Sequence, residues 1–254
     1  MLDAPSRAVR TRGLDMPVIS NRTKLAYFDV PKIACTSLKT LFWEIETGRK
    51  FPSPPYRFRF MRRLLKGLGY RSHSIHQIHQ EAGYETRSFL IAQPVPAGFE
   101  TVVVIRDPID RLYSAWKNKA SAQILQRKDG ESDLRNEGLP VQPGFGTYVE
   151  RLDHYRAVVR PVRVHTHPIA WHLGPTLDAF DHVFRMEDLE ALAEFLSKRL
   201  GRTVSVPHIN RTKAAAGIDR LNPIQVEALR SAVAADYIWL GGAYDFERSV
   251  RRFQ

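Results

Sequence analysis

Two segments of the sequence share one pattern, in which a short apolar run leads into a polar turn and then into an amphipathic helix. The apolar runs are residues 25–30 (LAYFDV) and 101–105 (TVVVI), and their β-branched and aromatic residues favour buried strands. Two such units with helical crossovers predict a parallel sheet that helices cover on both faces. We therefore expect a three-layer α/β fold in which both turns lie at the edge of the sheet where such folds bind ligands.

The residues after each run indicate where its helix begins. Pro31 ends the first strand, and Thr36 or Ser37 is expected to cap the helix that follows. After the second run, Asp107 is expected to be the N-cap of a helix with Pro108 at its first position. Both turns are thus expected to connect a strand directly to a helix N-terminus.

The C-terminal half carries further signals of the same kind. Residues 182–185 predict a short strand, and the leucine spacing over 189–200 predicts a helix that Gly201 ends. Asn222 and Pro223 predict the start of another helix by the same capping logic. These elements extend the alternation of strands and helices along the chain.

The length of 254 residues fits one α/β domain with a substantial core. We expect a polar N-terminal extension over residues 1–22 and a single domain over residues 23–254. Within that domain, residues 49–73 predict an irregular basic segment. Residues 127–146 are polar and contain glycine and proline, so they predict an insertion loop and a candidate lid.

Charge and cysteine content narrow the classes of partner. Lys and Arg outnumber Asp and Glu by 38 to 27, which favours nucleic acid, a membrane surface or ligands that carry phosphate or sulfate. The single cysteine, Cys35, excludes an intrachain disulfide and a Cys/His zinc framework. We see neither a signal peptide nor a run of about 18–20 apolar residues, so we expect a soluble cytoplasmic enzyme. A membrane anchor outside this sequence stays open. We also see no convincing cluster of metal ligands, so we expect no metal.

The first turn, residues 31–39 (PKIACTSLK), has the features of an anion site. A helix N-terminus offers backbone N–H groups and a favourable dipole to a phosphate, Lys32 adds a positive charge, and Thr36 and Ser37 add hydroxyl donors. Lys39, one turn along the helix, could reach back to the same place. The glycines of the G-x-x-x-x-G-K-[ST] loop are missing, so an ordinary nucleotide triphosphatase is disfavoured. On these residues alone, a plain turn with a solvated lysine is an equal alternative.

The second turn, residues 106–114 (RDPIDRLYS), has comparable features. Arg106 ends an apolar strand, where a guanidinium needs an anionic partner, and its planar fork suits a phosphate. Ser114 lies about two helical turns further on and can face the same crevice. The alternative is that Arg106 pairs with Asp107 or Asp110 while Ser114 only packs.

The segments VPKIACTSLK and VVVIRDPIDRLYSAW together resemble the sulfotransferases of the carbohydrate type, sulfotransferase family 2. That group includes the chondroitin and HNK-1 enzymes and, more distantly, the heparan sulfate 2-O-sulfotransferase. The order, spacing and strand contexts of both motifs match, and the resemblance covers roughly residues 24–246. The weaker matches within it are residues 165–168, 184–189, 208–213 and 237–246.

The resemblance implies a phosphate-binding-loop-like fold and in-line transfer of a sulfuryl group from 3′-phosphoadenosine 5′-phosphosulfate (PAPS) to an acceptor hydroxyl. The acceptor would be a carbohydrate or a small molecule, adenosine 3′,5′-bisphosphate would be the product, and no metal is required. The first motif would hold the 5′-phosphosulfate and the second the 3′-phosphate. The implied donor-binding residues are Lys32, Ala34, Cys35, Thr36, Ser37, Arg106, Ser114, Arg211 and Lys213.

The resemblance also suggests catalytic residues. Lys32 would stabilise the leaving group. A histidine suits the base near neutral pH, and His76 and His79 lie in SIHQIHQE, where the heparan sulfate enzyme carries its catalytic histidine pair. The alternative for either histidine is a surface or core role. The reserve candidates are His165, His167 and His172.

Two other residues of these turns have open roles. Cys35 lies at a helix N-terminus near Lys32, which together lower a thiol pKa, yet we interpret it as a small packing residue. Arg111 either supports the phosphate site or is an ordinary surface arginine.

Residues 56–71 (YRFRFMRRLLKGLGYR) support competing functions, because they mix arginine with aromatic residues. Such a segment is typical of single-strand nucleic-acid binders and of helices that lie on a membrane or on a partner. It also suits a binding face for an acidic polysaccharide acceptor, which we prefer, so we expect no nucleic-acid partner and no requirement for a membrane. An atypical nucleotide kinase is the last alternative, and the missing glycines disfavour it.

Overall fold

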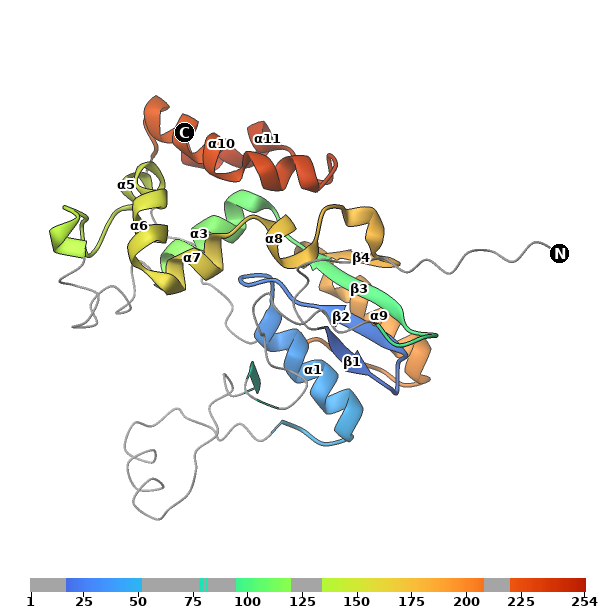
Figure 1. The fold of residues 1–254 in the computed structure, drawn as a ribbon. Helices are drawn as coiled ribbons and strands as arrows, with labels where there is room; N and C mark the ends of the chain where they lie inside the picture. Colours follow the sequence, from blue (N-terminus) through green and yellow to red (C-terminus); the bar gives the residue numbers. More distant parts are fainter. Residues whose placement is uncertain (1–16, 52–77, 80, 82–94, 120–133, 208–219) are drawn as a thin grey trace, which may run out of the picture.

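The structure is a computed structural model, and it is shown in Figure 1. It describes residues 17–51, 78–79, 81, 95–119, 134–207 and 220–254. Three predicted site residues, His76, Arg211 and Lys213, lie outside the described residues, as does most of the basic segment at 49–73.

The centre of the fold is a four-stranded sheet in the order β1-β2-β3-β4. The strands are β1 (Val18–Ser20), β2 (Leu25–Phe28), β3 (Glu100–Ile105) and β4 (His182–Arg185). Strands β2, β3 and β4 are parallel, as predicted, and helices flank them, which confirms the α/β fold.

One strand departs from the parallel arrangement. Strand β1 pairs antiparallel with β2 and falls inside the expected polar extension of residues 1–22. Val18 and Ser20 are buried in it. The sequence pattern did not predict β1, because three residues are too few to show the alternation of apolar and polar side chains by which a strand is recognised. An antiparallel edge strand also needs no helical crossover that would have indicated it.

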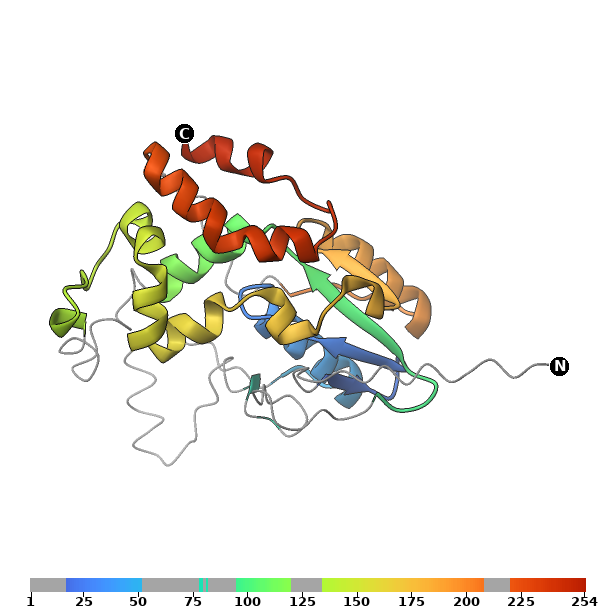
Figure 2. The same cartoon turned by 45° about the horizontal axis from the view of Figure 1, so that its top comes forward.

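The register brings the ends of the parallel strands to one edge. Phe28 of β2 pairs with Val103 of β3, and Ile105 of β3 pairs with Arg185 of β4. In Figure 2 the arrowhead of β3 points toward helices α3 and α10. The turns that follow β2 and β3 therefore lie side by side, as the two sequence patterns predict.

Four longer helices surround this sheet and its edge: α1 (Cys35–Thr47), α3 (Pro108–Lys119), α9 (Leu189–Leu200) and α10 (Pro223–Trp239). The shorter helices are α5 (Phe145–Glu150), α6 (Leu152–Val158), α7 (Arg160–Thr166), α8 (Ile169–Leu173) and α11 (Phe246–Val250). Single 3₁₀ turns are η2 (Leu177–Ala179), η3 (Met186–Asp188) and η4 (Arg251–Phe253).

Most of the predicted helix boundaries are confirmed. The Asp107 carboxylate accepts from the amides of Ile109 (2.9 Å) and Asp110 (3.1 Å), so it caps α3. Gly201 ends α9 with a left-handed φ of 63°, and Asn222 opens α10 with a capping box. The predicted cap of α1 is wrong, since the helix begins at Cys35 after Ala34 and has no side-chain cap.

The apolar side chains form two cores. One lies between the sheet and helices α1 and α9 and contains Leu25, Val103 and Leu192. The other holds together α3, α5–α7, α10 and α11 at the edge of the sheet, around Ile109 and Phe145. The second core places a helical wall next to the ends of the strands.

The described part of the expected insertion loop belongs to this second core. Leu134, Leu139 and Phe145 are buried, and the Pro143 carbonyl accepts from the Trp116 indole at 2.9 Å. The Tyr155 hydroxyl donates to the Pro140 carbonyl at 2.7 Å. Residues 134–146 are therefore packed structure rather than a lid. The sequence pattern did not predict this packing, because the apolar side chains of the segment are spaced too irregularly to show a helical or strand period.

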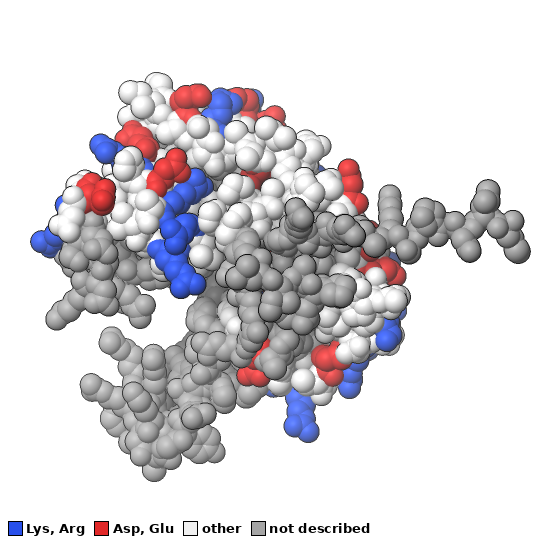
Figure 3. Space-filling view, viewed as in Figure 1, with Lys and Arg blue, Asp and Glu red and all other residues white. Residues whose placement is uncertain are grey.

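Figure 3 shows how charge is distributed on one face. Lys and Arg atoms form a stripe where Figure 1 places α6 and α7, whereas blue and red atoms alternate elsewhere on that face. No helix in the described ranges combines the length and the apolar character that crossing a bilayer requires.

Candidate active site

The first turn has a strained backbone. Lys32 and Ala34 take left-handed φ angles of 72° and 48°, for which glycine is the default residue and which cost an L-residue roughly 1–2 kcal/mol each. The Ile33 amide donates to the Val30 carbonyl at 3.2 Å and closes the turn. The turn thus lacks the glycines of a phosphate-binding loop but adopts conformations that favour glycine, and such strain is concentrated at functional sites.

A hydrogen bond joins the two motifs. The Arg106 guanidinium donates through Nη1 to the Lys32 carbonyl at 2.9 Å. The sequence left open that Arg106 pairs with Asp107 or Asp110, but the described residues contain no such ion pair. Asp107 caps α3 instead, and Asp110 pairs with Arg252 at 2.6 Å.

The environment of Arg106 suits an anion. Burial lowers the pKa of its guanidinium, because the charged form loses solvation, while nearby Asp110 and Glu187 oppose that shift. A partly buried cation that contacts a carbonyl rather than a carboxylate can still gain from an anionic ligand. Arg106 can therefore hold a phosphate beside the first turn.

Arg111 is a positioning residue rather than a surface arginine. Its Nε donates to the Pro31 carbonyl at 3.2 Å, its Nη2 to the His167 carbonyl at 2.8 Å and its Nη1 to Asp236 at 3.1 Å. The side chain is buried. A single guanidinium therefore links the first turn to α3, to the α7–α8 junction and to α10.

His79 lies at the first turn although 43 residues separate it from Thr36. The Nε2 atom of His79 and the Oγ1 atom of Thr36 are 3.0 Å apart. Thr36 is partly exposed at the start of α1. Of the predicted histidine pair, the described residue thus lies beside Thr36, and its role as the base stays a prediction.

Ser37 and Ser114 are both buried, at 4% and 5% exposure. Ser37 lies in the first turn of α1, whereas Lys32, Ala34 and Cys35 beside it are partly exposed. Within the described part of the chain no hydrogen bond joins Ser114 to Arg106. Its role at a 3′-phosphate, like that of Ser37 at a 5′-phosphate, stays a prediction.

The Cys35 thiol differs from the expectation of a lowered pKa. Burial raises its pKa, and the Asp29 carboxylate adds to the shift, while Lys39 and Lys32 oppose it only in part. The helix N-terminus does not compensate for the lost solvation. Cys35 is therefore suited to packing rather than to nucleophilic chemistry.

Lys39 forms a buried ion pair at the base of the first turn. Its Nζ lies 3.0 Å from an Asp29 carboxylate oxygen, and the two side chains are only 1% and 2% exposed. The pair ties the end of β2 to the first helical turns of α1. The ion pair therefore supports the first turn from the protein interior. Of the two lysines of the motif, Lys32 is partly exposed and Lys39 is buried.

Two of the three reserve histidines, His167 and His172, are poorly suited to act as the base. Burial lowers the pKa of His172 to about 3 and that of His167 to about 4, so both are weak bases near neutral pH. The Nδ1 atom of His165 lies 2.7 Å from the Pro161 carbonyl. His167 stacks on Trp171 with 4.0 Å between the ring centroids.

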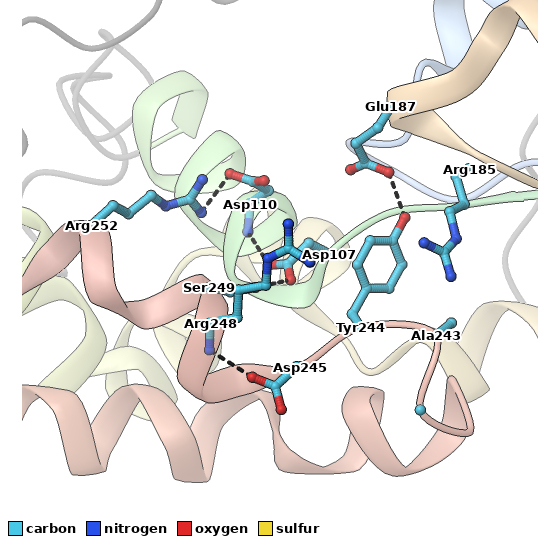
Figure 4. A pocket seen from close by; sticks show the side chains of 11 residues that line it. Asp107, Asp110, Arg185, Glu187, Ala243, Tyr244, Asp245, Arg248, Ser249 and Arg252 are labelled. Atoms are coloured by element: carbon cyan, nitrogen blue, oxygen red, sulfur yellow. Dashed lines mark hydrogen bonds and ion pairs between the residues drawn. The ribbon is translucent and has the colours of Figure 1, made fainter.

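Beside Arg106, the ends of β3 and β4 border a pocket of about 500 Å³ (Figure 4). Its charged and polar groups contact one another. Tyr244 donates to Glu187 and Ser249 donates to Asp107, each at 2.6 Å, while Arg185 lies over the Tyr244 ring. The lining residues are Asp107, Asp110, Arg185, Glu187, Gly242, Ala243, Tyr244, Asp245, Arg248, Ser249 and Arg252.

Sequence reasoning did not assign the C-terminal residues to the site. Tyr237 donates to Asp107 at 3.0 Å, and Asp236 holds both Arg111 and the Ile169 amide. The sequence feature that could have indicated these residues is the aromatic and acidic segment at 237–246. Among the described residues, no group of His, Cys, Asp and Glu has the arrangement of a metal site.

Fold and site together define an α/β protein that can hold an anionic ligand at the carboxyl edge of its sheet, as nucleotide-dependent transferases do. A family model described as "Sulfotransferase family" matches residues 16–232, which include both motifs. The chain therefore belongs to sulfotransferase family 2, and its general chemistry is sulfuryl transfer. Comparison with curated proteins and with solved structures gives no significant match.

Proposed function

We propose that this sulfotransferase uses PAPS as donor and transfers the sulfuryl group to a hydroxyl group of a carbohydrate. The observation that carries the proposal is the 2.9 Å hydrogen bond from Arg106 to the Lys32 carbonyl. It makes two candidate phosphate sites neighbours, and PAPS carries phosphate at both its 5′ and 3′ positions. A small-molecule acceptor remains the alternative at the acceptor side.

In the proposed reaction, the acceptor oxygen forms a bond to sulfur while the bond from sulfur to the 5′-phosphate oxygen breaks. Negative charge then builds on adenosine 3′,5′-bisphosphate. Lys32 stabilises that charge, the hydroxyls of Thr36 and Ser37 hold the 5′-phosphate, and Arg106 holds the 3′-phosphate. Catalysis by these residues consists mainly of positioning and electrostatics.

His79 is the proposed base. Its ring lies 3.0 Å from the Thr36 hydroxyl, so a proton leaving an acceptor beside the 5′-phosphosulfate has an imidazole within reach. The proton passes from the acceptor hydroxyl to a ring nitrogen as the new bond to sulfur forms. The other described histidines of this region, His167 and His172, have lowered pKa values that disfavour this role.

Titration calorimetry tests the donor. Adenosine 3′,5′-bisphosphate should bind more tightly than adenosine 5′-monophosphate, because only the former reaches Arg106. Arg106→Ala should weaken the bisphosphate by roughly 10- to 100-fold, as expected for a charge-assisted hydrogen bond, and should change the monophosphate little. A protein that ignores the bisphosphate and instead binds single-stranded DNA tightly would refute the proposal.

His79→Ala tests the base. With donor saturating, the variant should lose roughly 10²- to 10⁴-fold in kcat. His154→Ala, which removes an exposed histidine from α6, should retain the wild-type kcat. Bisphosphate affinity should be the same in all three proteins. An unchanged rate in His79→Ala would move the base to another residue.

A further inference from the structure

Three carboxylates lie around Arg106 at the carboxyl edge of the sheet. Asp107 is the next residue, Asp110 lies in the first turn of α3, and Glu187 follows the end of β4, the parallel neighbour of β3. Each of them opposes the fall in the pKa of Arg106 that burial causes, so all three act on its charge. Yet Arg106 donates to the Lys32 carbonyl, and within the described ranges it forms no ion pair with any of the three.

Each carboxylate is held by a side chain from the end of the chain, residues 237–254, which we name the C-terminal segment (Figure 4). The three contacts have the same length of 2.6 Å, and they join Ser249 to Asp107, Tyr244 to Glu187 and Arg252 to Asp110. Tyr237 adds a second donor to Asp107 at 3.0 Å. A carboxylate that already accepts a short hydrogen bond or faces a guanidinium gains less from another cation, which explains why Arg106 is left to the Lys32 carbonyl.

The C-terminal segment is anchored to the second core. Val250 and Phe253 are buried, and the Leu221 amide donates to the Phe253 carbonyl at 2.7 Å. The Asp245 carboxylate caps α11 by accepting from the Arg248 amide at 2.6 Å. The match to the family model ends at residue 232. The side chains that hold the three carboxylates therefore lie beyond the matched part of the chain, and the family assignment gives them no role.

Tyr244 shows how one of these contacts is kept. The Arg185 guanidinium lies over the Tyr244 ring, 5.2 Å from its centroid, so the ring is held independently of its hydroxyl. Burial raises the pKa of Tyr244, and the hydrogen bond to Glu187 raises it further. The phenol therefore keeps its proton near neutral pH and stays a hydrogen-bond donor to Glu187.

We propose that the C-terminal segment is a positioning element for donor binding, which holds the three carboxylates and so leaves the Arg106 guanidinium available to the 3′-phosphate. This inference rests on the proposed function and deepens it. Tyr244, Ser249 and Arg252 are positioning residues, because they act through carboxylates rather than on the donor. A carboxylate that loses its partner in the segment competes with the phosphate for Arg106, since a guanidinium suits both anions.

A double-mutant cycle between Tyr244 and Glu187 tests the proposal by titration calorimetry. Tyr244→Phe keeps the ring under Arg185 and removes only the hydroxyl, so adenosine 3′,5′-bisphosphate should bind roughly 3- to 10-fold more weakly, the effect of one hydrogen bond. Adenosine 5′-monophosphate, which does not reach Arg106, should bind as before. Adding Glu187→Gln should restore bisphosphate affinity, because the competing charge is gone. Glu187→Gln alone should strengthen binding by a smaller factor than it does in the Tyr244→Phe background.

Tyr155→Phe is the matched control for the lost hydroxyl. It removes a hydrogen bond of 2.7 Å to the Pro140 carbonyl in the second core and leaves the three carboxylates untouched, so bisphosphate affinity should equal that of wild type. Arg252→Gln is a second variant, at a side chain that is 38% exposed and whose loss the fold should tolerate. It should also weaken the bisphosphate, and Asp110→Asn should restore the affinity.

The outcomes separate this inference from the proposed function. If wild type does not bind the bisphosphate, or if Arg106→Ala binds it as tightly as wild type, the proposed function itself fails. If Arg106→Ala weakens the bisphosphate but Tyr244→Phe and Arg252→Gln do not, only the inference about the C-terminal segment fails. It also fails if Glu187→Gln strengthens binding by the same factor in both backgrounds, or if Tyr244→Phe weakens the monophosphate equally, because a merely structural role predicts those results.

Discussion

Replacing Lys32 by alanine is expected to lower kcat for sulfuryl transfer by roughly 10²- to 10³-fold, the usual effect of removing one charge-stabilising group. In the proposed reaction the Lys32 ammonium is the cation that faces the leaving 5′-phosphate. The fold should survive, because the side chain is partly exposed and Arg106 contacts only the Lys32 carbonyl. Steady-state kinetics with PAPS, together with a thermal melt, measure both effects.

Lys24→Ala is the matched control for this change. Lys24 also has a left-handed φ, of 54°, but it precedes β2 and lies at the opposite end of that strand, over the Phe99 ring. Alanine at either position keeps the same backbone strain and removes one lysine. Lys24→Ala should keep wild-type kcat. Full activity in Lys32→Ala would assign leaving-group stabilisation to another cation.

Signals confined to a few neighbouring residues predicted most of the fold. The run TVVVI predicts β3, and Asp107 with Pro108 predicts the start of α3, since each depends on local propensity and capping. The same reasoning failed at α1, where Ala34 takes a left-handed φ and no side chain caps the helix. Propensity does not predict a left-handed alanine, because the packed surroundings impose that conformation.

Contacts between distant segments could not be predicted in this way. Arg111 contacts Asp236 across 125 positions and Pro31 across 80, and no local pattern distinguishes such an arginine from a surface one. His79 could be proposed only from a family resemblance, and its contact with Thr36 depends on the path of the intervening chain. The long-range contacts that support the two turns were therefore less predictable than the turns themselves.

The second large effect, a loss of stability, is expected when the buried Lys39–Asp29 ion pair next to the first turn is broken. Lys39→Met removes the ammonium that faces Asp29 at 3.0 Å, with both side chains almost fully buried. Breaking one half of a buried ion pair typically costs about 3–5 kcal/mol, because the remaining charge stays in a medium of low polarity. Chemical denaturation should show a loss of free energy of unfolding of this size. Lys50→Met, at an exposed position after α1, should change stability little.

Adding Asp29→Asn to Lys39→Met separates charge from packing. If the cost comes from a buried charge, the double variant should recover a large part of the lost stability, because both ions have been removed. The pair also links the end of β2 to α1 below Lys32 and Thr36, so the single variant should bind adenosine 3′,5′-bisphosphate more weakly than the double. A single variant within about 1 kcal/mol of wild type, the range of exposed ion pairs, would show that the pair does not hold the turn in place.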